Sequence, residues 1–238
     1  MEVLQLSDIF TRAIEENEIF VFSGPGGTGK SEIAANIATF LRTRGIPCAV
    51  VDLDFGKSDF TLRSQRFALE EFFFPQKKVP FSEAPIVERE LIGLFQEAGS
   101  DLRLVVDLGG DQKGFRVFRS LKPFWEKKKM EMVLVVNFAR PFFKRPKDYV
   151  TFLREIGERF GVGFSSLVAN THLMHETDYA LLAEGWKKTQ RLEEELGIPV
   201  LFASLWEKKR VLYPLINWGG NAVASISRFA RLPWGEED

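Results

Sequence analysis

The stretch from Ile19 to Ser31 reads IFVFSGPGGTGKS, and its pattern decides how the rest of the chain is interpreted. An apolar run, Ile19–Ser23, leads into a glycine-rich loop of the form Gly-x4-Gly-Lys-Ser. Glycines let a backbone turn so that several N–H groups point at one anion. A helix that begins near Lys30 would direct its positive end at the same anion. The stretch therefore predicts a strand, a phosphate-binding loop and a helix in succession.

Each polar residue of this P-loop pattern has an expected task. Lys30 would neutralise the outer phosphates of a nucleoside triphosphate, and the Ser31 hydroxyl would bind Mg²⁺. The residues expected to contact the nucleotide are Gly24, Pro25, Gly26, Gly27, Thr28, Gly29, Lys30 and Ser31. A glycine-rich turn that matches the pattern by chance is the alternative. The apolar strand before the loop and the helical pattern after it supply the context that a functional P-loop needs.

Short apolar runs alternate with amphipathic stretches along most of the chain. The predicted strands are Ile19–Ser23, Cys48–Leu53, Leu102–Leu108, Met132–Phe138, Ser165–Ala169 and Val200–Ala203. The predicted helices are Lys30–Arg44, Glu83–Ala98, Gln112–Lys128, Pro146–Phe160 and Thr177–Leu196. Strands that are apolar throughout and alternate with helices indicate a parallel sheet covered on both faces. We therefore expect an α/β fold, with a mostly parallel twisted sheet that binds ligands at the carboxyl ends of its strands.

Two segments depart from this alternation. Residues 55–87 have the character of an irregular insert, and residues 207–232 that of a helical segment that closes the sheet. Within the second segment, Gly219-Gly220 marks a break. No repeat, low-complexity tract or linker divides the chain, so we predict a single nucleotide-binding domain over residues 1–238.

The composition is that of a globular protein with a full core, because 45% of its 238 residues are hydrophobic. A net charge of −1 gives no overall field toward nucleic acid or an anionic membrane, so neither partner is indicated. Cys48 is the only cysteine, which suits a reducing compartment and excludes a Cys-x-x-Cys metal site. The acidic start has no signal-peptide pattern, and no apolar run approaches the ~20 residues of a membrane helix. We therefore expect a cytoplasmic protein.

Acidic residues end two further apolar runs. Asp107 closes LRLVVD and precedes Leu-Gly-Gly, as is typical of the Walker B aspartate that binds Mg²⁺ directly or through water. Asp52 and Asp54 close VVDLD and share one side of the strand, because side chains alternate. One of these two acids could position an attacking water. A solvated strand end is the alternative for both.

The motifs GPGGTGKS, VVDLDFGKSDFTL and LVVDLGG, in this order and spacing, resemble the MinD/ParA-type ATPases, the deviant-Walker P-loop family of the SIMIBI class. The resemblance implies an ATP-binding switch protein that uses Mg²⁺ and forms a nucleotide-dependent homodimer. It implies that Lys30 and Ser31 bind the phosphates and Mg²⁺, and that Asp107 is the Walker B acid. Asp54 would orient the hydrolytic water and contribute to the metal site.

Two asparagines and one proline refine this resemblance. The family places an asparagine at the end of a later strand to read adenine, and Asn170 in SSLVANTHL occupies that kind of position. Asn137 in VLVVNFARP resembles another strand-end asparagine of the family. Pro25 stands where the family carries a second phosphate-directed lysine. Because proline supplies no charge, we expect slow hydrolysis or a nucleotide-gated binder.

These features favour an ATP-binding protein that is a slow Mg²⁺-dependent ATPase and acts as a nucleotide-controlled switch. ATP is favoured over GTP because the segment Asn170–Leu173 lacks the lysine and aspartate of the guanine-binding Asn-Lys-x-Asp pattern. The alternative is a phosphotransferase that acts on a small molecule or a nucleic-acid end, with an acceptor pocket beside Asp54. A nucleotide-dependent metal-delivery factor is a third interpretation, which the lack of paired cysteines disfavours.

Three groups of residues carry weaker signals. The phenylalanines between Phe67 and Phe81 are either a docking surface for an unidentified protein partner or the core of the insert. His172 and His175 fit a metal site less well than ordinary loop positions. The basic groups Lys127–Lys129 and Arg140–Lys147 are interpreted as solvated faces, with nucleic acid or acidic lipid as the alternative.

Overall fold

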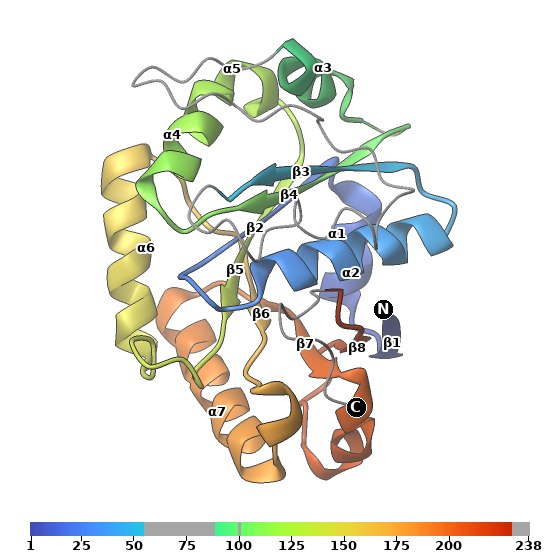
Figure 1. The fold of residues 1–238 in the computed structure, drawn as a ribbon, viewed down its shortest axis with the longest axis vertical. Coiled ribbons are helices and arrows are strands. Elements are labelled where there is room, and N and C mark those ends of the chain that lie inside the picture. Colours follow the sequence, from blue (N-terminus) through green and yellow to red (C-terminus); the bar gives the residue numbers. More distant parts are fainter. Residues whose placement is uncertain (55–88, 100, 230–238) are drawn as a thin grey trace, which may run out of the picture.

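A computed structural model describes residues 1–54, 89–99 and 101–229 of the chain. Eight strands form one sheet in the order β1-β8-β7-β6-β5-β2-β4-β3 (Figure 1). The strands are β1 (Glu2–Gln5), β2 (Ile19–Ser23), β3 (Cys48–Leu53), β4 (Arg103–Leu108), β5 (Met130–Val136), β6 (Ser166–Ala169), β7 (Val200–Trp206) and β8 (Val223–Ile226). The helices are α1 (Asp8–Glu16), α2 (Lys30–Thr43), α3 (Arg89–Glu97), α4 (Gln112–Ser120), α5 (Lys122–Trp125), α6 (Pro146–Phe160) and α7 (Tyr179–Leu196), with the 3₁₀ helices η2 (Met174–Glu176) and η3 (Glu207–Leu215).

The sheet is parallel except at one edge. Every described strand pair runs parallel apart from β1 with β8, which is antiparallel. Parallel neighbours need a crossover between them, and the helices supply these crossovers. The predicted α/β fold with a mostly parallel sheet is therefore confirmed. The carboxyl ends of β2, β3 and β4 meet at one edge, where the phosphate loop begins.

Helices cover both faces of the sheet, and the alternation of strand side chains decides which helix meets which residue. Phe20 and Phe22 of β2 pack in one core cluster with α1 and α2. Ile19 and Val21 of the same strand lie in the cluster on the other face, which α3, α4 and α6 cover. All four side chains are fully buried, as expected for a central strand of a covered sheet. Figure 1 shows α1 and α2 on one side of the sheet and α4, α6 and α7 on the other.

The helix predicted over Gln112–Lys128 is wrong in its length, because the structure has two helices there. α4 ends at Ser120 and α5 begins at Lys122 with a proline, Pro123, in its first turn. Proline has no backbone N–H and fixes its own φ, so it favours the start of a new helix over the continuation of an old one. The predicted helix Pro146–Phe160 has the same bounds in the structure, and Gly161 ends it in the left-handed conformation.

The helical interpretation of residues 207–232 is partly wrong. η3 covers its first part, but Val223–Ile226 form β8, which pairs with both β7 and β1. Gly219 and Gly220 have φ values of 61° and 82°, and this turn directs the chain back into the sheet. A short apolar run does not reveal its partner strands, and β1 was not predicted for the same reason. The insert predicted over residues 55–87 lies outside the described residues, and the single domain stays a prediction.

No helix in the described parts of the chain is both long and apolar enough to cross a membrane.

Candidate functional site

The glycine-rich loop connects β2 to α2, and its glycines have the conformations that such a loop requires. Gly24, Gly27 and Gly29 have φ values of 153°, 78° and 91°. A Cβ at Gly24 would lie 2.6 Å from the Val135 carbonyl oxygen, so the loop lies directly on β5. Thr28 holds the turn, since its hydroxyl donates to the Pro25 carbonyl at 3.0 Å. No side chain caps the amino end of α2, and its positive end faces the loop.

Lys30 is the buried cation of this loop. Its side chain is 5% exposed, and its Nζ lies 3.5 Å from the Pro25 carbonyl oxygen and 3.5 Å from Asp54 Oδ2. The Asp54 side chain is 19% exposed. An anion that enters the loop would therefore compete with Asp54 for the ammonium group.

Asp107 lies at the same edge of the sheet, at the end of β4. It pairs in register with Phe22 of β2 and with Asp52 of β3, and it is fully buried. Neither of its carboxylate oxygens has a hydrogen-bond partner among the described residues. Burial and the neighbouring charge of Asp52 raise the pKa of Asp107 well above its usual range, while Lys30 and the nearby Ser31 hydroxyl act in the opposite direction.

Asp52 and Asp54 take different positions at the end of β3. Asp52 is 7% exposed, and its Oδ1 accepts a hydrogen bond of 3.0 Å from the Asp54 backbone N–H. Asp54 faces Lys30 and also lies against Gly109, where an added Cβ would come within 2.9 Å of Asp54 Oδ1. The pair predicted from VVDLD is therefore at the site, with Asp54 the acid in contact with the loop lysine.

The segment after β4 packs directly on the glycine-rich loop. A Cβ at Gly110 would overlap the Gly24 carbonyl, so only glycine fits. Asp111 then caps α4, because its Oδ1 accepts from the backbone N–H groups of Lys113 and Gly114 at 2.9 Å each. The loop, the end of β4 and the start of α4 are therefore one contiguous unit.

Asn170, directly after β6, packs against the glycine-rich loop. Its Nδ2 donates to the Thr28 carbonyl at 2.6 Å, and its Oδ1 accepts from the Ser204 hydroxyl and lies 3.0 Å from His172 Nε2. A Cβ at Gly29 would overlap Asn170 Nδ2, so the loop and the side chain are in close contact. Asn170 is 1% exposed. Its expected role as the adenine-reading residue stays a prediction, which requires these bonds to be exchanged for the base.

Asn137 belongs to the same buried network. Its backbone N–H donates to the Tyr149 hydroxyl at 2.7 Å, and its Nδ2 donates to the His172 carbonyl at 3.2 Å. Its Oδ1 accepts from the Ala139 backbone N–H at 3.0 Å. The network therefore joins the segments that follow β5 and β6.

Arg140 is a second cation beside the loop that the sequence did not reveal. A Cβ at Gly27 would lie 3.4 Å from Arg140 Nε, and this Nε is buried without a hydrogen-bond partner in the described parts of the chain. Burial of the His172 ring lowers the pKa of His172 to about 4, and the positive charge of Arg140 contributes to this shift. The sequence placed Arg140 in a solvated basic group. Only the packing of the segment after β5 onto the loop distinguishes it from its exposed neighbour Lys144.

The two histidines do not share a site. His172 is held by Asn170, whereas the His175 ring meets the Trp206 ring at a centroid distance of 4.5 Å. Burial, with a smaller effect of Arg140, keeps His172 neutral near pH 7. In residues 1–54, 89–99 and 101–229, no cluster of three or more His, Cys, Asp or Glu side chains is placed to hold a metal ion.

The structure thus gathers the expected residues at one edge of the sheet. The loop, Lys30, Asp54 and Asp107 lie together, and Asn170 is hydrogen-bonded to the loop at Thr28. The buried carboxylate of Asp107 fits a hydrated Mg²⁺, which takes one or two protein carboxylates together with phosphate oxygens. The Phe67–Phe81 region lies outside the described residues.

Comparison with known proteins agrees with this arrangement. The family model described as ParA, the NUBPL iron-transfer P-loop NTPases, matches residues 15–65. No curated protein matches the chain in sequence. The resemblance to MinD/ParA-type P-loop NTPases is thereby confirmed over the segment that holds the glycine-rich loop.

Solved structures are similar in fold. FtsY from Mycoplasma mycoides superposes with a TM-score of 0.52 at 15% identity, covering 84% of this chain and 61% of that one. The cell division protein FtsY from Thermotoga maritima gives 0.51 at 16% identity, covering 82% and 64%. Chloroplast FtsY from Physcomitrella patens gives 0.50 at 14% identity, covering 78% and 57%. The chain therefore spans about three fifths of the length of these relatives and shares the P-loop NTPase fold with them.

Proposed function

We propose that this chain, which has the fold of the P-loop NTPases, binds ATP with Mg²⁺, hydrolyses it slowly and acts as a nucleotide-controlled switch. The observation that carries the proposal is the buried Asp107 carboxylate, whose oxygens have no hydrogen-bond partner in the described structure. A buried carboxylate is costly unless a cation or hydrogen-bond donor compensates it. Its position beside Lys30 and Ser31 supports a ligand that brings both phosphate and a divalent cation.

Phosphate binding in this account depends on the backbone and on Lys30. The amide groups from Gly26 to Ser31 and the amino end of α2 provide donors for phosphate oxygens. Lys30 exchanges its contact with Asp54 for a contact with the outer phosphates. The released Asp54 carboxylate then faces the terminal phosphate.

The metal would be held by the Ser31 hydroxyl and, directly or through water, by Asp107, in agreement with the Walker B interpretation. When bound, Mg²⁺ neutralises charge on the phosphates. The Asp54 carboxylate orients a water molecule for attack on the terminal phosphorus. The bond from that phosphorus to the bridging oxygen breaks, and ADP and inorganic phosphate leave.

Arg140 offers the second phosphate-directed charge that Pro25 cannot supply. It contacts Gly27 from the segment after β5, and its Nε has no partner in the described residues. A guanidinium at this place would stabilise charge on the phosphates within one chain. Dimerisation is then not needed to bring a second cation, which favours a homodimer that responds to nucleotide over one that completes the site.

The switch depends on the contact of Gly110 with Gly24, which ties the nucleotide loop to α4. A change in the loop on nucleotide binding would move the start of this helix and any surface on it. We propose ATP as the nucleotide, because residues after β6 lack the guanine-binding pattern.

Iron transfer, which the description of the matching family names, is not proposed for this chain. Cys48 is its only cysteine. The Cys48 thiol donates to the Ala38 carbonyl, and burial raises its pKa to about 11, so it is a poor metal ligand at neutral pH.

The test is to incubate the protein with Mg²⁺-ATP alone and with Mg²⁺-GTP alone, and to measure phosphate release and dimer formation. Slow phosphate release with ATP, and a mass that responds to ATP, would support the proposal. Binding of ATP without any phosphate release until an acceptor is added would favour the phosphotransferase. A preference for GTP would contradict the assignment of the base.

A further inference from the structure

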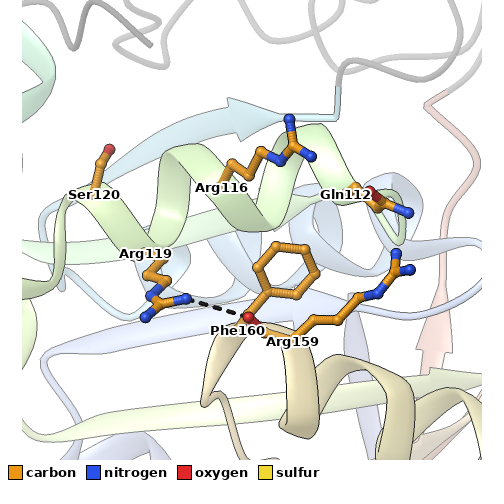
Figure 2. A pocket seen from close by; sticks show the side chains of 6 residues that line it. All are labelled: Gln112, Arg116, Arg119, Ser120, Arg159 and Phe160. Atoms are coloured by element: carbon orange, nitrogen blue, oxygen red, sulfur yellow. Dashed lines mark hydrogen bonds between the residues drawn. The ribbon is translucent and has the colours of Figure 1, made fainter. Parts of the chain in front are cut away.

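An open cavity of about 660 Å³ lies between α4 and the end of α6 (Figure 2). We define the arginine pocket by the residues that line it: Gln112, Arg116, Arg119, Ser120, Arg159 and Phe160. Three of these side chains are guanidinium groups, although the chain as a whole has a net charge of −1. Charge is therefore concentrated at this place in a way that composition does not explain.

The geometry of α4 presents these groups on one face. Gln112, Arg116 and Arg119 follow one another at spacings of four and three residues, so their side chains share one side of the helix. The opposite side, with Phe115 and Phe118, is fully buried in the core. The pocket-lining face of α4 is exposed, as is Arg159 on α6.

The base of the arginine pocket packs against the core and joins the two helices. The Phe160 ring is 8% exposed and stacks on Phe115 at a centroid distance of 5.4 Å. Arg119 Nη1 donates to the Arg159 carbonyl at 3.2 Å, which satisfies one of the terminal carbonyls of α6 and joins the two helices. Figure 2 shows this bond and the Arg159 side chain extending toward Gln112.

The positive charges of the arginine pocket have no counterion in the described structure. No carboxylate of residues 1–54, 89–99 or 101–229 forms an ion pair with Arg116, Arg119 or Arg159. Three like charges around one cavity repel one another, and an anion would relieve that repulsion. Guanidinium groups bind carboxylate and phosphate through paired hydrogen bonds.

We propose that the arginine pocket is the docking site for an acidic segment of a partner protein, whose carboxylates pair with Arg116 and Arg159 while an apolar side chain contacts Phe160. Charge complementarity identifies the occupant. The open cavity and the combination of arginine with an aromatic floor favour a polypeptide over an enclosed small ligand.

Docking at the arginine pocket responds to nucleotide, and this part rests on the proposed function. α4 begins at the Asp111 cap, and its Gly114 lies so close to β3 that a Cβ there would come within 2.8 Å of the Leu53 carbonyl oxygen. The preceding Gly110 lies on Gly24 of the loop. A shift of the loop or of β3 therefore moves α4 and its arginines.

The test uses a short fluorescein-labelled peptide that contains consecutive glutamates and one tryptophan, with a matched peptide in which glutamines replace the glutamates. Anisotropy measures binding to the full chain with no nucleotide and with Mg²⁺-ATP. The pocket variant is Arg116→Ala with Arg159→Ala. The matched control is Arg12→Ala with Arg154→Ala, which removes the same charge from exposed positions outside the pocket.

We expect the acidic peptide to bind at least about tenfold more weakly to the pocket variant, and less than about twofold more weakly to the control, since central arginines dominate such contacts. Equal weakening in both double variants would overturn the proposal, because general charge would then explain binding. Tighter binding of a single-stranded oligonucleotide than of the peptide, lost in the same pocket variant, would also overturn it.

The coupling to nucleotide has its own readout. Peptide affinity should change about fivefold or more with Mg²⁺-ATP in the wild type, within the usual range of coupling between sites. The change should vanish in Lys30→Ala, while peptide binding itself remains. If the wild type binds no ATP, the proposed function fails, yet the comparison of pocket and control variants still decides the docking site. An affinity that ATP leaves unchanged in a wild type that binds ATP would contradict the coupling.

Discussion

Asp107 and Asn170 are buried polar residues at the same edge of the sheet, and they differ in whether their side chains have hydrogen-bond partners. Asn170 is 1% exposed, and both polar atoms of its side chain have partners. Asp107 is fully buried, and both of its oxygens have none in the described structure. A satisfied buried amide stabilises a fold, whereas an unsatisfied buried carboxylate destabilises it. The half of the sheet formed by β2, β3 and β4, which we call the binding side, thus holds the destabilising carboxylate. The half that contains β6 and β7, which we call the supporting side, holds the satisfied amide that packs against the loop.

The largest expected effect is on ATP binding and concerns Lys30, on the binding side. Lys30→Ala should weaken ATP binding by about 100-fold or more, because it removes a buried charge directed at the phosphates. Isothermal titration calorimetry measures the loss, and circular dichroism verifies that the variant is folded. Lys113→Ala, an exposed lysine on α4, is the control that should bind as the wild type does. Unchanged affinity in Lys30→Ala would remove the P-loop lysine from the account.

The next effect separates binding from turnover on the same side. Asp54→Ala should lower the rate of phosphate release by about 100-fold, because a group that positions water acts in the transition state. Its affinity for ATP should be equal to or tighter than that of the wild type, since Lys30 no longer has to leave Asp54. Single-turnover kinetics and calorimetry give the two numbers. An Asp54→Ala variant that hydrolyses ATP normally would favour the phosphotransferase.

A smaller effect is expected from the second cation beside the loop. Arg140→Ala should reduce ATP affinity or turnover by about tenfold, and Arg140→Lys should restore part of it, because the charge returns without the fork geometry. The exposed Lys144→Ala is the matched control. Equal activity of Arg140→Ala and Lys144→Ala would show that Arg140 is only a packing residue next to Gly27.

The smallest expected effect is on stability and concerns the supporting side. Ser204→Ala removes the hydroxyl that bonds to Asn170 and to the Ala169 carbonyl, so the free energy of unfolding should fall by about 1–3 kcal/mol. Ser166→Ala on the neighbouring strand removes a buried hydroxyl that has no partner in the described residues, and it should cost less. Urea denaturation measures both. A larger loss in Ser166→Ala would contradict the claim that the hydroxyl bonded to Asn170 stabilises the fold more than a buried hydroxyl without a partner in the described residues.

Much of the binding side could be predicted from the sequence, because its signals are local. The loop from Gly24 to Ser31 and the strand-end acids Asp54 and Asp107 lie within short motifs, and the bounds of β2 and β3 follow from their apolar runs. The confirmed α/β fold follows from the alternation of those runs with helices.

The contacts that hold the loop in place could not be predicted, because they join distant segments of the chain. Arg140 meets Gly27, and Ser204 meets Asn170, across more than thirty residues of sequence. Strand β8 is stabilised by partners on both sides that a four-residue apolar run does not reveal. No periodicity within a segment records which other segment will cover it.

The most direct test of the central claim is calorimetric titration of ATP into the wild type and into Asp107→Asn, each with Mg²⁺ and with EDTA. We predict that the wild type binds one ATP per chain and binds it more tightly with Mg²⁺, while Asp107→Asn binds ATP with little or no response to Mg²⁺. Near pH 7 and without nucleotide, the variant should also unfold at a higher temperature, because it removes a buried carboxyl whose pKa is raised in the folded state. A wild type that binds no ATP, or an Asp107→Asn variant that keeps the full response to Mg²⁺, would contradict the account.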